Sequence, residues 1–192
     1  MNEKDAILLI EEMISKTKND IKENGFYYYF WGWLVFISAV SNFLILYFNW
    51  FEFHSLPWVV LMPLGGIATA FFSKREKKDE AKVQTYVSQS MKYALKAYAV
   101  SLFIVCFTMS YGEQWKAFYP TIMMIYAIWL YVSGGLLNFK PLIWGAYSNW
   151  LLAAVGYMWP STMVHLALIA IGVLAGFIIP GHWLKYRESK RV

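Results

Sequence analysis

The long apolar stretches of this chain contain no aspartate or glutamate. Proton-coupled transporters and pumps usually need a carboxylate or a similar relay inside the membrane. Motifs of membrane enzymes are missing too, because the sequence has no His-Glu-x-x-His helix, no paired intramembrane aspartates, no P-loop and no Gly-x-Ser-x-Gly elbow. These absences argue against most membrane enzymes and leave open one that is built from histidine and hydroxyl groups.

Cysteine and charge are also scarce. Cys106 is alone in an apolar stretch, so an internal disulfide is excluded. Charged residues make up 15% of the chain, whereas about 25% is usual in soluble domains. The first five residues lack the basic segment and apolar core of a cleavable signal peptide, so we expect the first apolar span to direct insertion. One membrane domain without a separate soluble domain is predicted.

Six apolar stretches, each near the length that crosses a bilayer, occupy most of the chain. They cover residues 26–48, 57–73, 93–111, 118–137, 142–159 and 162–179. The sequence therefore predicts an all-α fold, a polytopic membrane bundle of six transmembrane helices. The bundle is expected to consist of three α-hairpins over residues 26–182, and Pro180-Gly181 is expected to end the sixth helix.

The cations are distributed on one side of this predicted bundle. All 17 Lys and Arg residues except Lys116 fall in segments that the topology places on the same side. Because cytoplasmic loops carry the excess of cations, both chain ends are predicted in the cytoplasm, with residues 183–192 as a basic tail. Anionic inner-leaflet lipid explains the pI near 9.1 without a nucleic-acid partner.

Two cytoplasmic segments have apolar residues at helical spacing. Residues 1–25 are predicted to form an amphipathic cytoplasmic or interfacial helix, with its apolar face on residues 6–21 and a stop or hinge at Asn24-Gly25. A second apolar face falls on residues 83–91. Such faces bind a partner helix or the membrane surface, so both segments are candidate contacts for a protein partner.

The entry into the first span resembles that of small, uncharacterised bacterial inner-membrane proteins. The amphipathic helix leads through residues 24–26 (Asn-Gly-Phe) into residues 30–33 (Phe-Trp-Gly-Trp), and compact spans follow. The resemblance covers mainly residues 1–45. It implies a multi-pass protein of the bacterial inner membrane and brings no known activity, cofactor or functional residue.

Polar and aromatic residues inside the spans are candidates to line a cavity. They are Ser38, Asn42, Tyr126, Trp129, Asn149 and His165. Because an asparagine in hydrocarbon is costly without a partner, the two Asn side chains are expected to face inward. They either form hydrogen bonds between helices or line a polar cavity, and the rings either pack or line a pocket.

Glycines mark predicted helix-packing positions. They are Gly65, Gly66, Gly134, Gly135, Gly172 and Gly176. Gly172-x-x-x-Gly176 is a close-packing motif that shares a helix face with His165. This histidine is interpreted either as a ligand or proton-sensing group near the outer mouth, or as a side chain hydrogen-bonded to a neighbouring segment. The small-residue faces also allow packing between copies, so a homo-oligomer stays open.

A metal site on the outer side is the weakest hypothesis. Glu52, His54, Glu113 and His165 are the candidate ligands, and mixed His and carboxylate ligands suit zinc or related ions. Their spacing is not diagnostic, and solvated loop charges are the simpler interpretation, so no metal and no cofactor is predicted.

The leading function is a non-enzymatic interaction or regulatory protein. The alternative is a channel or transporter for a small solute, and a membrane enzyme ranks third.

Overall fold

The computed structural model describes residues 3–50, 52–76, 86–110 and 115–189, and every element in these ranges is a helix. The elements are α1 (Glu3–Phe48), α2 (Leu56–Glu76), α3 (Tyr86–Ser110), α4 (Trp115–Leu136), α5 (Lys140–Met158), α6 (Thr162–Val173), the π-helix η1 (Leu174–Ile178) and α7 (Ile179–Ser189). The predicted all-α class is confirmed.

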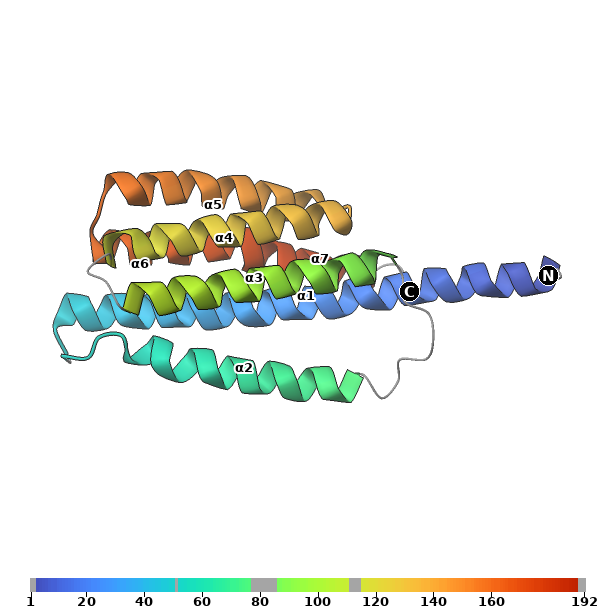
Figure 1. Ribbon diagram of the computed structural model, residues 1–192, viewed down its shortest axis with the longest axis horizontal. Helices are drawn as coiled ribbons and strands as arrows, with labels where there is room; N and C mark the ends of the chain where they lie inside the picture. Colours follow the sequence, from blue (N-terminus) through green and yellow to red (C-terminus); the bar gives the residue numbers. More distant parts are fainter. Residues whose placement is uncertain (1–2, 51, 77–85, 111–114, 190–192) are drawn as a thin grey trace.

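The helices lie side by side, and those from α1 to α6 alternate in direction, whereas η1 and α7 continue in the direction of α6 (Figure 1). α1, α3 and α5 end at the side of the bundle where α2, α4 and α6 begin. The α4–α5 turn and both chain ends lie toward the opposite side, where α1 extends well past the other helices. The N-terminal part of α1 is therefore outside the bundle.

α1 is a single helix of 46 residues. At 1.5 Å per residue it is about 69 Å long, roughly twice the thickness of a bilayer core. The predicted stop at Asn24-Gly25 is wrong, because the helix passes through both residues without a break. Gly25 packs against α7 instead: a Cβ at this position would lie 3.3 Å from a methyl group of Leu184.

The sixth span also continues past its predicted end. α6 passes through η1 into α7, so the expected break at Pro180-Gly181 is wrong. Proline has no N–H to donate, and the π-turn before it changes the hydrogen-bond pattern, with the Ile179 N–H donating to the Leu174 carbonyl. Gly181 lets α7 approach α1, because its Cβ would lie 2.9 Å from the Tyr29 nitrogen.

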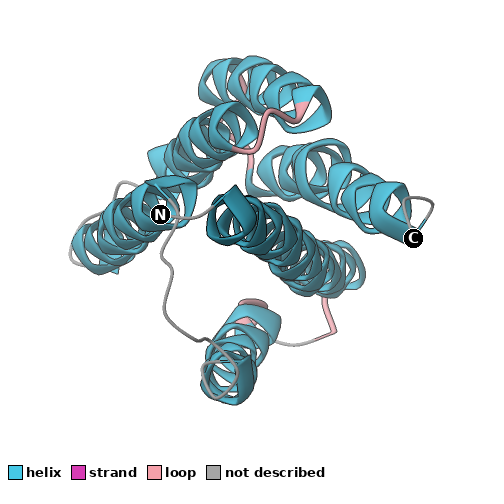
Figure 2. Cartoon of the chain, turned by 90° about the vertical axis from the view of Figure 1, so that its right-hand side faces the viewer, coloured by secondary structure: helices cyan, strands magenta, loops and turns pink. Residues whose placement is uncertain are grey.

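The core is formed by α1, α4, α5 and the continuous helix α6–η1–α7. Its most buried apolar side chains are Ala39, Met123, Leu130, Leu142, Leu166 and Ile169. α2 packs on α1, and α3 packs on α4. Seen end-on, α2 stands apart from the remaining helices (Figure 2).

Four helices in the described part of the chain are long and apolar enough to cross a membrane. These segments are Gly25–Phe48, Gln89–Thr108, Lys116–Leu136 and Thr162–Tyr186. The apolar part of α2, Leu56–Phe72, is shorter. Exposed large apolar side chains are distributed over all the helices from α1 to α7, as expected of a surface that faces lipid.

Candidate functional site

The buried polar side chains form the candidate site. Ser38, Asn42, Ser133, Asn149 and His165 are all buried inside the bundle. Both asparagines face inward, as the sequence predicts, and His165 is buried as well. Their partners decide whether they line a cavity or join helices.

Asn42 joins α1 to the start of α2 at the end of the bundle where α1 passes into α2. With its amide oriented to satisfy both contacts, its nitrogen donates to the His54 carbonyl (2.9 Å) and its oxygen accepts from Trp58 Nε1 (3.0 Å). The Tyr119 ring of α4 lies near this contact, with 6.4 Å between its centroid and that of the Trp58 ring. Asn42 therefore fixes the start of α2 against α1. Ser38, one turn earlier, donates to the Leu34 carbonyl of its own helix (2.8 Å).

His165 connects α6 to α5. It is 2% exposed, and its Nε2 lies 2.8 Å from the Gly156 carbonyl. Because a carbonyl only accepts, the hydrogen must be on Nε2. The Tyr119 ring lies near the imidazole, with 6.0 Å between the ring centroids. These contacts support the interpretation of His165 as a hydrogen-bonded side chain between helices.

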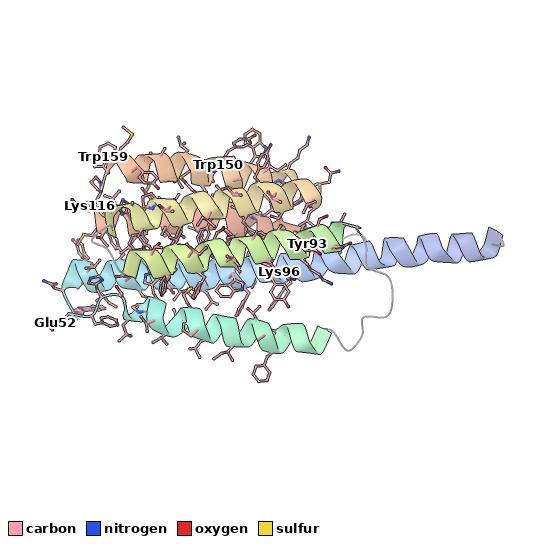
Figure 3. The ribbon with its side chains drawn as sticks, in the orientation of Figure 1. Glu52, Tyr93, Lys96, Lys116, Trp150 and Trp159 are labelled. Atoms are coloured by element: carbon pink, nitrogen blue, oxygen red, sulfur yellow. The ribbon has the colours of Figure 1, made fainter. Side chains whose placement is uncertain are left out.

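The other metal candidates do not assemble with His165 in the described residues. Glu52 is exposed at the end of the bundle where Lys116 and Trp159 also lie (Figure 3). His54 Nδ1 is 3.2 Å from the hydroxyl of the adjacent Ser55, and Glu113 is outside the described residues. The part of the chain that the structure describes contains no group of three His, Cys, Asp or Glu side chains that could hold a metal ion.

Asn149 of α5 fills the space that the glycine motif of α6 leaves open. Its Nδ2 donates to the carbonyls of Gly145 (2.8 Å) and Gly172 (2.9 Å). A Cβ on Gly172 would lie 2.7 Å from Asn149 Oδ1, and one on Gly176 would lie 2.7 Å from Nδ2. The motif thus accommodates a polar side chain, a pairing that the sequence did not indicate because 23 residues separate Asn149 from Gly172.

Two of the six predicted packing glycines do not pack within the described residues. Gly66 and Gly135 have nothing within 4 Å of the position of a Cβ, so neither is a contact between described helices of one chain. Gly65 packs against Leu34 of α1, and Gly134 faces Ile143 of α5. In each Gly-Gly pair, the exposed glycine follows the packed one.

Tyr126 and Trp129 belong to an aromatic cluster between α1, α3, α4 and η1. The Tyr126 ring meets the Phe177 ring of η1 edge to face, with 5.4 Å between the ring centroids. The centroids of the Trp129 and Tyr98 rings, from α4 and α3, are 5.2 Å apart. Tyr28 of α1 packs on Trp129 at 6.2 Å. The Tyr28 hydroxyl faces Ser133 but makes no hydrogen bond of good geometry with a described residue. These rings fill the space between four elements.

A surface groove of about 430 Å³ lies between α5 and the η1–α7 segment. Its lining residues are Lys140, Pro141, Trp144, Gly145, Ser148, Ala175, Ile179, Pro180 and Trp183. None of the six predicted cavity residues lines it. The sequence does not indicate this groove, because Lys140 and Pro141 fall between two predicted spans and Trp183 falls in the predicted basic tail.

The two candidate partner segments are only partly described. The side chains of residues 6–21 are outside the description, although their backbone is helical. Residues 83–85 are outside it as well. In the adjoining part of α3, Met91 is buried and Gln89 is exposed, so at least one residue of the 83–91 face packs within the chain.

No protein family model, curated protein or solved structure matches the chain. Four described helices are long and apolar enough to cross a bilayer and large apolar side chains are exposed on them, which indicates a helical membrane protein. Function is therefore inferred from the arrangement of the helices and from the contacts between them.

Proposed function

We propose that this is a non-enzymatic interaction or regulatory protein of the bacterial inner membrane. Its membrane bundle anchors a long helix that extends into the cytoplasm and binds a partner. The continuity of α1 from Glu3 to Phe48 is the observation that carries the proposal. A helix that is rigidly continuous with a membrane span presents its surface at a defined distance from the bilayer.

Six helices cross the membrane in this proposal, and both chain ends are cytoplasmic. The alternating helix directions support it, as does the distribution of the cations. Lys96 lies toward the end from which α1 extends, together with Tyr93, whereas Lys116 lies at the opposite end (Figure 3). The bacterial location rests on the resemblance of residues 1–45.

The base of the extended helix is held by α7. Gly25 packs on Leu184, and the Tyr29 ring meets His182 edge-on at 4.4 Å. Lys185 Nζ lies 5.9 Å from the centroid of the same Tyr29 ring. These contacts fix the direction in which α1 leaves the bundle. Residues 3–24 form about 33 Å of helix on the N-terminal side of this contact, a length that exceeds the thickness of the headgroup region.

The sequence pattern of this extension suits a helical partner. Apolar residues between Ala6 and Ile21 recur at the spacing of one helix face, and polar residues such as Ser15 and Asn19 fall on the opposite face. An amphipathic helix of this kind is recognised by a groove or a second helix that covers its apolar stripe. The partner is thus expected to contact residues 6–21.

The buried polar residues favour this function over transport. A transporter for a small solute would use Asn42, Asn149 and His165 to line its pathway. In this bundle their side chains form hydrogen bonds between segments instead. The bundle therefore serves better as an anchor than as a pathway.

The proposal is tested by making the apolar face polar without breaking the helix. The variant Ile10→Gln with Ile14→Gln changes the apolar face, and Ser15→Gln with Asn19→Gln is the matched control on the opposite face. Glutamine is a good helix former, so both variants keep the helix. After cross-linking in cells, we expect partner recovery to fall at least about tenfold for the first variant, since this corresponds to about 1.4 kcal/mol for two buried side chains.

The control variant is expected to recover the partner as the wild type does, and both variants should accumulate equally in the membrane. Recovery of the same partner in the same yield from the first variant would contradict the proposal.

A further inference from the structure

The groove between α5 and α7 results from a close crossing of two helices. The helices approach closely at Gly145 and Gly176, where a Cβ on Gly145 would lie 2.6 Å from the Gly176 Cα. α5 packs more extensively on η1 than on α7. The helices therefore separate toward Lys140 and Trp183, and the groove opens between them at the end of the bundle that carries the cations.

The walls and the floor of the groove fit a hydrocarbon chain. Trp144 is 71% exposed and Trp183 is 61% exposed, so large apolar rings stand at its sides. Small residues, Gly145, Ser148 and Ala175, line the space between them. Lys140 and Ser148 are eight residues apart on α5, a rise of about 12 Å, which is most of the roughly 15 Å depth of one leaflet of the hydrocarbon core.

The single positive charge in the lining of the groove indicates which kind of ligand it binds. Lys140 is the one charged residue among the nine that line the groove, and it is exposed at the first position of α5. A second copy of the chain, docked through the same groove about a two-fold axis, would bring its own Lys140 to this site and no carboxylate. A ligand that joins an anion to an apolar chain can pair its charge with Lys140 and pack its chain against the Trp144 and Trp183 rings.

We propose that this groove binds an anionic glycerophospholipid of the inner leaflet. The lipid phosphate lies at Lys140, and one acyl chain lies in the groove between Trp144 and Trp183. The tryptophans are suited to the interface because an indole combines an apolar body with an N–H donor. The inference rests on the proposed membrane topology, which brings this end of the bundle to the inner leaflet.

The test is native mass spectrometry of the purified full chain in detergent. The probes are phosphatidylglycerol and phosphatidylcholine with identical acyl chains, added in equal amounts. We expect phosphatidylglycerol to bind preferentially. Lys140→Gln should reduce its binding about fivefold, the factor that corresponds to about 1 kcal/mol for one cation at a lipid headgroup. Trp183→Ala should weaken both lipids, because it removes a wall of the groove.

Two matched variants control for general effects. Lys185→Gln removes an exposed cation that lies over the Tyr29 ring, and Trp159→Ala removes an exposed indole at the opposite end of the bundle. Both are expected to bind phosphatidylglycerol as the wild type does. Equal binding by Lys140→Gln and wild type, an equal loss in Lys185→Gln, or a dimer that dissociates in Trp183→Ala would each overturn the proposal. Lipid binding by the purified chain does not depend on the cytoplasmic partner, so the two proposals can fail separately.

Discussion

Individual glycines set how closely the helices approach one another. Gly145, Gly172 and Gly176 face a backbone or an asparagine amide at distances where no side chain fits. Close approach of this kind matters in membranes. Lipid tails are as apolar as the side chains, so the hydrophobic effect does not bring helices together, and packing and hydrogen bonds do so instead. Because the helices are this close, the Asn149 amide can donate to a carbonyl of its own helix, Gly145, and to one of α6, Gly172.

Gly145→Ala is expected to destabilise the protein by about 1–3 kcal/mol, the usual cost of forcing atoms into a packed site. The added Cβ would meet the backbone of Gly176, which cannot rotate away as a side chain can. The midpoint of thermal unfolding in detergent measures the effect.

Gly135→Ala is the control, since nothing lies within 4 Å of its Cβ position. Its midpoint should stay the same or rise, because alanine favours a helix over glycine by about 1 kcal/mol. Equal destabilisation by both variants would contradict the close crossing of α5 and η1.

At the scale of elements, apolar periodicity and length predicted that the chain is helical, and the structure agrees. The breaks at Asn24-Gly25 and Pro180-Gly181 were predicted from local preferences and do not occur. Packing against another helix outweighs those preferences: Gly25 lies on Leu184, and Gly181 lies on Tyr29. Neither contact is visible in the sequence, since about 150 residues separate the partners.

In the candidate site, too, the sequence indicates which side chains are buried but not which groups they contact. The inward position of Asn42 and Asn149 followed from the cost of burying a polar group in hydrocarbon, and that of His165 followed from the helix face that it shares with Gly172 and Gly176. The His54 and Gly156 carbonyls, to which Asn42 and His165 bind, are backbone atoms that carry no sequence signal. The groove was missed because it depends on the angle between two helices, and residue types do not indicate that angle.

Continuity of α1 predicts a fixed distance across Gly25. Spin labels at Ser15→Cys and Trp33→Cys, with Cys106→Ala as background, are 18 positions apart, so their backbones are separated by about 27 Å in one straight helix. Double electron–electron resonance in lipid should give one narrow distribution near this value. A broad distribution shifted to shorter distances would show a hinge at Asn24-Gly25 and would contradict the rigid extension.

At the scale of the whole molecule, the cations and the helix directions together predict the orientation. A thiol reagent that does not cross the membrane should label cysteines introduced at Lys116 or Ser161 in intact cells, after Cys106→Ala. Cysteines at Ser15 and Asn138 should react only after the membrane is opened. Labelling of Ser15→Cys in intact cells would contradict the cytoplasmic position of the extended helix.

Site-specific photo-cross-linking in living cells tests the proposed function most directly. A photoreactive residue is placed at Ile10, on the apolar face of the extension, or at Asn19, on its opposite face. We predict a discrete protein adduct at position 10 and at least about tenfold less of it at position 19, because the partner covers only the apolar stripe. Adducts of equal yield at both positions, or no protein adduct at position 10, would contradict a partner-binding cytoplasmic helix.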